Sequence, residues 1–258
     1  HENAGRDHRS HRGGKGVTAF ASTMGPMIPP SIFMILYGSI ANVSIGALFL
    51  GGFVPGVLIG LFLMVLVAIL TRGQSYAVPR GAFQWSVVRV AGREAIWALV
   101  MPGIVVGGIL FGWMTPTEAS IVAVVYSLFV GIVILKTINW RSLRMVVLDA
   151  AVTAGSVLLL VAIAAMFGYL LTRWRFDQLL LNLLQRTTTN PYLVVAEIII
   201  ALFVLGGIMD EIATTIMFVP SLAVIGAKLG FDPVHFGVVM VLAILIGAVV
   251  PPVATLLF

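Results

Sequence analysis

The sequence GPMIPP at residues 25–30 recurs as GAVVPP at residues 247–252, and both copies interrupt long stretches without charged residues. A proline pair breaks an α-helix, because each ring removes a backbone N–H donor and clashes with the preceding turn. A broken helix at membrane depth exposes backbone groups that only protein or a water-filled cavity can satisfy. Paired breaks in two halves of a membrane protein point to a transporter's binding site. Two loop prolines at the membrane edges are the alternative.

The composition indicates an integral membrane protein. Hydrophobic residues make up 60% of the chain and charged residues only 10%, whereas soluble domains carry about 25% charged residues. The mean hydropathy is +1.11. From Gly16 to Thr71 there is no acidic, basic or histidine residue, a run longer than the ~20 apolar residues of one crossing. We therefore predict an all-α, polytopic helix bundle in a lipid bilayer.

Residues 1–16 are polar and do not match the rest of the chain. Their composition predicts a disordered tail. A metal site formed by His1, His8 and His11 is the alternative, although this spacing suits no standard site. The net charge of +5 is attributed to arginines that flank membrane spans rather than to nucleic-acid binding. The chain has no cysteine, which excludes disulfides and thiol chemistry.

Apolar runs and breakers predict the order of helices. Two half-helices at 17–28 and 31–42 surround the first proline pair, and a turn at Gly51-Gly52 and Pro55-Gly56 precedes a span at 53–71. Two basic loops, 72–93 and the one holding Lys136, Arg141 and Arg144, are placed in the cytoplasm. The next predicted spans are residues 95–112, 116–135 and 150–172. Further arginines after Thr172 leave the later topology open.

Thr115-Pro116-Thr117-Glu118 has the pattern of a capping box with proline at the first helical position. This helix start is complete without a functional role. The alternative is that the hydroxyls and Glu118 face a polar cavity.

The second half of the sequence holds the acidic residues that lie among apolar ones. A short helix with Leu179, Leu180, Leu183 and Leu184 on one face is predicted to lie in the membrane interface. Asn190-Pro191 starts the next helix, which carries Glu197. That glutamate is either functional or reaches back to the interface. Asp210-Glu211 follows a glycine pair, where a short re-entrant hairpin ending near Pro220 is predicted. Asp232-Pro233 caps the last helix, and His235 is interpreted as a turn or interface residue rather than a ligand.

Several motifs in a fixed order resemble one known family. They are GPMIPPS at 25–31, YG at 37–38, SIG at 44–46, GFVPG at 52–56, TPTEA at 115–119, GIMDEIA at 207–213, Pro220, GFDPVHFG at 230–237 and the second proline pair. From Val17 to Phe258 the chain resembles the DctM-like large permease subunit of tripartite ATP-independent periplasmic (TRAP) transporters. The ordered set is more specific than any one motif.

The resemblance implies a secondary transporter of the bacterial inner membrane and not an enzyme. Such transporters take up organic acids, such as C4-dicarboxylates or sialic-acid-like sugar acids, in symport with sodium and without another cofactor. A small membrane subunit and a periplasmic solute-binding protein are the implied partners. The implied fold is an elevator built from inverted repeats, each with a re-entrant hairpin and a broken helix.

On this resemblance, residues 25–31 are the first helix break, 207–220 the second hairpin, and 247–252 the second break. Sodium is a hard cation that prefers oxygen ligands, and helix N-termini favour a substrate carboxylate. The candidate ion- and substrate-binding residues are Gly25, Ile28, Ser31, Asp210, Thr214, Thr215, Gly247 and Val250. The predicted helix-breaking residues are Pro29, Pro30, Pro251 and Pro252.

The chain departs from the family pattern in three ways. Val250 and Ala254 stand where the family has Thr and Gly, so one expected sodium contact lacks its hydroxyl. The family's first hairpin would precede Val17, where the polar tail stands. The helix that follows the second break is missing. We therefore expect residues 17–258 to be a partial transporter domain, and the chain to be a fragment.

Two other functions remain as alternatives. A membrane-embedded enzyme would need paired acids, a Ser–His arrangement or a metal site. The sequence has no HExxH and no GxSxG motif, and the adjacent Asp210 and Glu211 do not face each other on a helix. A channel-like or non-transporting membrane scaffold is the second alternative, since broken helices also occur in channels.

Overall fold

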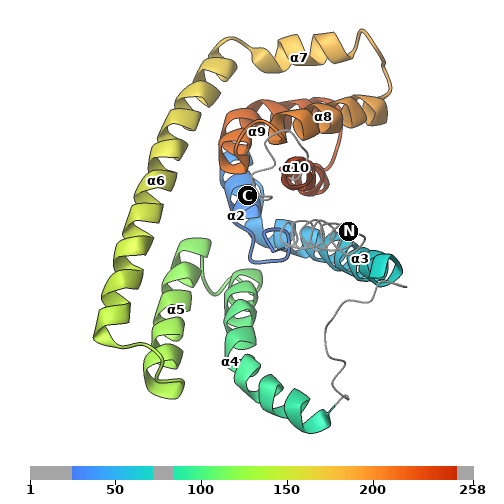
Figure 1. The fold of residues 1–258 in the computed structure, drawn as a ribbon. Helices are drawn as coiled ribbons and strands as arrows, with labels where there is room; N and C mark the ends of the chain where they lie inside the picture. The colour runs from blue at the N-terminus through green and yellow to red at the C-terminus, as the bar shows by residue number, and fades with distance from the viewer. Residues whose placement is uncertain (1–24, 72–83, 249–258) are drawn as a thin grey trace, which may run out of the picture. The chain divides into compact units, whose positions relative to one another are not determined.

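The computed structural model describes residues 25–71 and 84–248, and within these ranges the chain is helical with no β-strand (Figure 1). Its elements are α2 (Ile32–Ala41), α3 (Ile45–Thr71), α4 (Trp85–Leu110), α5 (Pro116–Phe129), the π-helical turn η1 (Val130–Ile134), α6 (Trp140–Arg173), α7 (Phe176–Leu184), α8 (Pro191–Gly206), α9 (Glu211–Lys228) and α10 (Pro233–Gly247). The prediction of an all-α chain is confirmed. The predicted tail at 1–16 and the half-helix at 17–28, up to residue 24, lie outside the described residues. The last part of that half-helix was predicted wrongly, because residues 25–28 form a turn and a bend before the proline pair.

Several helices are long and apolar enough to cross a bilayer. In the described part of the chain, four helical stretches qualify by length and composition: Ile45–Ile69, Pro116–Ile134, Trp140–Arg173 and Glu211–Lys228. Shorter apolar helices accompany them, among them α2, α8 and α10. Exposed large hydrophobic residues cover the long helices, as is expected where the surrounding solvent is lipid.

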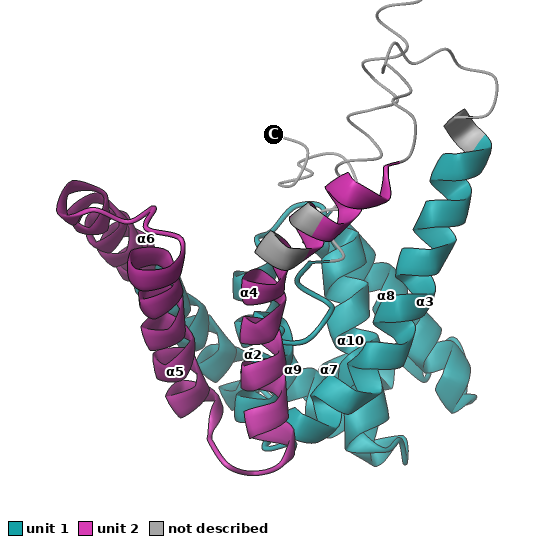
Figure 2. Cartoon of the chain, turned by 90° about the horizontal axis from the view of Figure 1, so that it is seen from below, with its two compact units in different colours: residues 1–71, 157–258 teal, residues 72–156 magenta. Residues whose placement is uncertain are grey.

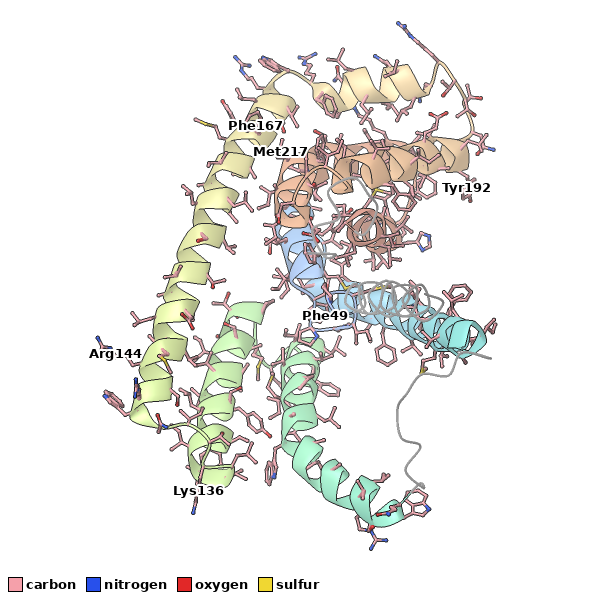
Figure 3. The ribbon with its side chains drawn as sticks, viewed as in Figure 1. Phe49, Lys136, Arg144, Phe167, Tyr192 and Met217 are labelled. Atoms are coloured by element: carbon pink, nitrogen blue, oxygen red, sulfur yellow. The ribbon has the colours of Figure 1, made fainter. Side chains whose placement is uncertain are left out.

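The chain forms two compact units, residues 1–71 with 157–258 and residues 72–156 (Figure 2). In the second unit α4 packs against α5, and the Tyr126 hydroxyl donates a hydrogen bond of 2.9 Å to the Trp97 carbonyl. Lys136 lies at the connection between η1 and α6, and Arg144 projects from the first turns of α6 (Figure 3). The basic loop predicted from the sequence therefore lies at the start of a long apolar helix.

Helix α10 is the centre of the first unit. It packs against α8, α9, α3 and α2, and a helix that is apolar all round is expected to be buried in this way. The buried residues of α10 are Phe236, Gly237, Val238, Met240, Val241, Ala243, Ile244, Leu245 and Gly247. This helix joins the element after the first proline pair to the hairpin formed by α8 and α9.

The predicted turn at Gly51-Gly52 and Pro55-Gly56 is wrong, because α3 runs unbroken from Ile45 to Thr71 with Pro55 inside it. Gly52 and Gly56 are instead positions where α3 closely approaches other parts of the chain. A Cβ atom on Gly52 would meet the Met34 side chain of α2, and one on Gly56 would lie 3.4 Å from the Ile28 side chain. Small residues at membrane helix interfaces allow such close approach.

Three other boundaries also differ from the predictions. Helix α4 begins at Trp85, so the second half of the predicted loop 72–93 is helical. Helix α6 begins at Trp140, ten residues before the predicted span at 150–172. Helix α9 continues through Pro220 to Lys228, so the hairpin is larger than the predicted 207–220 segment. In each case a long apolar helix extends through residues that single-residue preferences assign to a loop.

Candidate functional site

The first proline pair lies in an irregular segment that leads into α2. Residues 25–30 form turns and bends, and Ser31 is the N-cap of α2. The Ser31 side chain is completely buried, and its Oγ accepts a hydrogen bond of 3.3 Å from the Met34 backbone N–H. The predicted candidates Gly25 and Ile28 are exposed at this segment, whereas Pro29 is buried and Pro30 exposed. Helix α2 thus begins directly after the proline pair, and the predicted helix break at Pro29 and Pro30, like its role as a binding site, stays a prediction.

The turn between α8 and α9 presents Asp210 at a helix start. Helix α8 ends at Gly206, and Asp210 is the N-cap of α9. The Asp210 Oδ1 accepts hydrogen bonds from the Ile212 N–H at 2.9 Å and the Ala213 N–H at 3.2 Å. A carboxylate at this place satisfies free N–H groups and interacts favourably with the helix dipole. This structural role accounts for Asp210 at the start of α9, and its role in ion binding stays a prediction.

Thr214 and Thr215 follow one turn later, and both are completely buried. The Thr214 hydroxyl donates to the Asp210 carbonyl at 2.9 Å, and the Thr215 hydroxyl donates to the Glu211 carbonyl at 2.7 Å. Each hydroxyl uses its proton in these bonds and keeps lone pairs that can face a cation. The first turn of α9 thus gathers hydroxyl, carbonyl and carboxylate oxygens, which are ligands suited to a hard cation.

The end of α10 lies directly against the end of α8. A Cβ atom on Gly247 would lie 2.9 Å from the Leu202 carbonyl oxygen and 3.2 Å from the Gly206 Cα atom. Gly247 is the last residue of α10, and Gly206 the last of α8. The turn that leads to Asp210 therefore lies beside the helix end that leads to the second proline pair. Val250, Pro251 and Pro252 are outside the described residues.

The structure separates the predicted candidates into two groups. In the first group, Gly247 packs against the end of α8, and Asp210, Thr214 and Thr215 form the start of α9, which follows that end after a short turn. In the second group, Ser31 lies at the start of α2, whereas Ile40 lies near its end. Ile40 packs against the cluster formed by Ala164, Ala213 and Ile216. The rise of an α-helix puts Ser31 and Ile40 about 13 Å apart along α2. The first break and the first turn of α9 are thus both in contact with α2, but towards opposite ends of it.

Two other acidic positions have local explanations. The predicted capping box at the start of α5 is present, and the Glu118 side chain accepts a hydrogen bond of 2.7 Å from the Thr115 N–H. Glu197 accepts a hydrogen bond of 2.7 Å from the Thr187 hydroxyl through Oε1, and its Oε2 is buried without a hydrogen-bond partner. No group of three or more His, Cys, Asp or Glu side chains suited to a metal ion is found among the described residues.

Two features of this region could not be anticipated from motifs. Gly206 is the contact partner of Gly247, and the only sequence signal for it is the glycine pair at 206–207. A cavity that opens beside α8 is lined by residues no motif singled out. Both depend on contacts between elements far apart in the sequence.

Comparisons with known proteins add an independent line of argument. A family model described as "Tripartite ATP-independent periplasmic transporter, DctM component" matches residues 6–258. The chain is 33% identical over 244 residues to the sialic acid TRAP transporter large permease protein SiaM of Vibrio cholerae, covering 94% of this chain and 57% of that protein. It is 34% identical over 247 residues to the C4-dicarboxylate TRAP transporter large permease protein DctM of Pseudomonas aeruginosa, covering 95% and 57%.

A third relative is the isethionate TRAP transporter permease protein DctMQ of Oleidesulfovibrio alaskensis. The identity is 36% over 242 residues, which cover 94% of this chain and 38% of that protein. The chain thus spans little more than half the length of the curated large permease proteins it matches.

Proposed function

The chain belongs to the family of the DctM component of TRAP transporters, and from this membership we propose that it forms part of a sodium-coupled uptake system for organic acids. In this proposal a small membrane subunit and a periplasmic solute-binding protein are its partners. The named relatives act on sialic acid, C4-dicarboxylates and isethionate. All of these are organic anions, so the substrate class proposed here is a carboxylate or sulfonate.

Family membership identifies the class of protein. The relatives are permease components of transporters and not enzymes, and they are proteins of the inner membrane. This chain therefore belongs to a family of inner-membrane transporter components, and the resemblance found in the sequence is confirmed. The enzyme alternative is excluded on the same ground.

The observation that carries the proposal is the meeting of α8, α9 and α10. The capped start of α9, its two buried threonines and the end of α10 at Gly247 come from distant parts of the sequence. Helix termini at membrane depth offer partial charge and free backbone groups, which is how transporters bind ions and anionic substrates. We assign sodium to the oxygen atoms of Asp210, Thr214 and Thr215, and the substrate to the helix ends beside them.

The test is uptake into proteoliposomes. The chain and, in parallel, a version completed to the length of its relatives are reconstituted with the small subunit and binding protein of the same locus. Uptake of labelled succinate, N-acetylneuraminate and isethionate is measured with a sodium gradient and with a potassium gradient of equal size. Accumulation above the outside concentration, with sodium only, is the expected result.

The possible results separate the proposal from its competitors. Uptake that only equilibrates the substrate, independent of sodium, would mean a channel and would overturn the proposal. The absence of uptake of every organic anion by the completed version would favour the scaffold. Uptake by the completed version alone would place the activity in the longer protein, with this chain as one part.

A further inference from the structure

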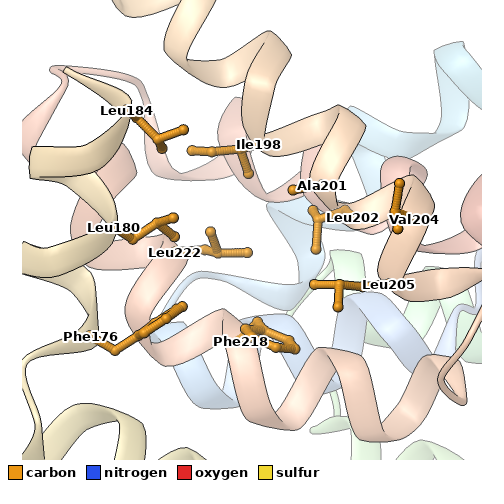
Figure 4. A pocket seen from close by; sticks show the side chains of 10 residues that line it. All are labelled: Phe176, Leu180, Leu184, Ile198, Ala201, Leu202, Val204, Leu205, Phe218 and Leu222. Atoms are coloured by element: carbon orange, nitrogen blue, oxygen red, sulfur yellow. The ribbon is translucent and has the colours of Figure 1, made fainter. Parts of the chain in front are cut away.

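A cavity of about 440 Å³ lies among α7, α8 and α9 (Figure 4). This volume is within the range of ~300–1,000 Å³ that is usual for small-molecule sites. Phe176 and Phe218 lie at one end, and Leu184 and Ile198 at the other (Figure 4). The remaining lining residues are Leu180, Ala201, Leu202, Val204, Leu205 and Leu222. Every lining residue is apolar.

The wall chemistry selects the class of ligand. A cavity without polar partners does not hold ordered water, whereas it accepts an apolar molecule. None of the lining side chains offers a hydrogen bond to a carboxylate substrate, so the cavity is unsuited to the proposed organic acids. Around a membrane protein, the abundant flexible apolar molecule is the acyl chain of a lipid. The ligand of this cavity therefore differs in chemical class from the organic acids assigned to the proposed transport site.

Basic residues gather at the Phe176 end of the cavity. Arg173 and Arg175 lie three residues and one residue before Phe176, and both are exposed. In the described part of the chain, no ion pair involves either arginine; the ion pair found there joins Lys228 to Asp177 at 2.9 Å. Because Lys228 compensates the carboxylate of Asp177, the charge of the two arginines remains available.

The opposite end of the cavity carries charges of both signs, since the exposed Arg186 follows the lining residue Leu184 by two positions. Glu197 precedes the lining residue Ile198, and one of its carboxylate oxygens is buried without a partner. A negative group bound there would be attracted by Arg186 but repelled by Glu197, since like charges disfavour each other. The Phe176 end has two arginines and no uncompensated carboxylate, whereas the opposite end has one arginine and the carboxylate of Glu197, so an anionic group is favoured at the Phe176 end.

The Phe176 end also lies where a membrane helix terminates. Helix α6 has 34 residues, a length of about 51 Å at the rise of an α-helix. This exceeds the ~40–45 Å of a bilayer with its headgroups. Arg173 is the last residue of α6, and arginines at helix ends are typical of the headgroup level. α7 follows at once and exposes Leu179 and Leu183 on its outer face.

We propose that the cavity binds one acyl chain of an anionic phospholipid, whose phosphate is bound by Arg173 and Arg175. The lipid fills the space among α7, α8 and α9 and links the interfacial helix to the hairpin that carries Asp210. The proposal does not depend on the transported substrate, so it can fail or succeed separately from the transport function.

The test uses the whole chain, purified in detergent and depleted of lipid. Native mass spectrometry counts bound lipids, and thermal unfolding measures the stabilisation that each lipid gives. Phosphatidylglycerol is compared with phosphatidylcholine carrying the same acyl chains. We expect phosphatidylglycerol to bind at one saturable site and to raise the unfolding temperature more than phosphatidylcholine does.

Two pairs of variants test the two halves of the site. Leu180→Trp fills the cavity and should abolish the saturable lipid, whereas Leu179→Trp on the outer face of the same helix should not. Arg175→Gly removes a guanidinium and also relieves a left-handed backbone, since Arg175 has φ of 54°. Arg175→Gly should weaken the affinity for phosphatidylglycerol about fivefold. Arg186→Gln, at the far end of α7, should leave this affinity unchanged.

Each result bears on the proposal. If Leu180→Trp does not fold, Ala201→Phe fills the same cavity from α8 and takes its place. Equal binding of the two lipids by the unchanged chain, or equal effects of Arg175→Gly and Arg186→Gln, would overturn the headgroup assignment. Retention of the saturable lipid after the cavity is filled, or no saturable lipid at all, would overturn the acyl-chain assignment.

Discussion

At the scale of single residues, Asp210 combines two roles that substitutions can separate. Its carboxylate accepts two backbone N–H groups at the start of α9, and the proposal also gives it a sodium ion. Asparagine keeps the acceptor and is a good N-cap, whereas alanine removes it. The stability of the protein should therefore distinguish the two replacements, whereas sodium binding should be weakened by both.

We predict that Asp210→Ala lowers the free energy of unfolding by about 1 kcal/mol, while Asp210→Asn leaves it nearly unchanged. Both variants should raise the sodium concentration needed for half-maximal uptake, because the carboxylate charge is lost in both. Thermal unfolding and a sodium titration of uptake measure the two effects. An Asn variant with unchanged sodium dependence would remove the carboxylate from the ion site and leave it as a cap.

Helix starts are the part of the structure that single residues predicted well. Thr115-Pro116, Asn190-Pro191 and Asp232-Pro233 each begin a helix as expected, because the cap and the fixed φ of proline act within one turn. The turn predicted at Gly52 and Pro55 was wrong because their conformation is not decided within one turn. Their place in α3 depends on contact with α2, which no local pattern contains.

At the scale of elements, α8 and α10 approach as closely as backbone atoms allow. A Cβ atom at Gly247 would lie 2.9 Å from the Leu202 carbonyl and close to Gly206. Because these neighbours are backbone atoms, they cannot rotate away. Gly60 in α3 has no neighbour within 4 Å of such a Cβ position and is the matched control.

We predict that Gly247→Ala destabilises the protein by about 1–3 kcal/mol, since overpacking forces the helices apart. Gly60→Ala should be neutral or stabilise by up to ~1 kcal/mol through helix propensity. The unfolding temperatures in detergent give the comparison. An alanine at 247 as stable as the unchanged chain would mean that α8 and α10 do not touch at this point.

Helices α7 and α9 are joined by the ion pair of Asp177 and Lys228. Lys228 donates a hydrogen bond of 2.9 Å to Asp177, and this bond, with the lysine charge, holds the pKa of Asp177 below its usual range. A folded-state pKa below the unfolded one means that the unfolded chain binds more protons at acidic pH. The pair therefore stabilises the fold above the ordinary aspartate pKa of ~3.9, and this contribution is lost as pH falls further.

We predict that Asp177→Asn costs less than about 1 kcal/mol at pH 7, because Lys228 is 40% exposed and solvent screens the pair. The variant and the unchanged chain should converge in stability below pH 4. Unfolding temperatures between pH 3 and pH 7 test this, with Asp149→Asn as the control for removal of a carboxylate. A difference that persists or grows on acidification contradicts the assignment.

At the scale of the whole molecule, the sequence predicted the class better than the arrangement. Hydrophobic composition and the order of motifs identified an all-α membrane protein of the DctM family. The cavity among α7, α8 and α9 was not predictable, because Phe176, Ile198 and Phe218 come together only in the folded chain. The inverted repeats stay a prediction, since Pro251 and Pro252 lie outside the described residues.

The direction of the chain after Thr172 can be decided by labelling, because the sequence contains no cysteine. Helix α6 is long enough to cross the bilayer once, and basic residues lie at its start, with Lys136 before it and Arg141 and Arg144 in its first turns. The positive-inside rule puts these in the cytoplasm. The arginines after Thr172 then belong to the opposite side, where the rule does not favour them.

We predict that a membrane-impermeant maleimide labels Thr137→Cys only from the cytoplasmic side and Gln178→Cys only from the periplasmic side. Both positions are exposed and flank α6, whose length of about 51 Å separates them. Leu158→Cys, within α6, should stay unlabelled from either side because the bilayer core excludes the reagent. Intact cells and inside-out vesicles provide the two sides. Labelling of 137 and 178 from the same side would mean that α6 does not cross, and the phospholipid headgroup at Arg173 and Arg175 would then belong to the cytoplasmic leaflet.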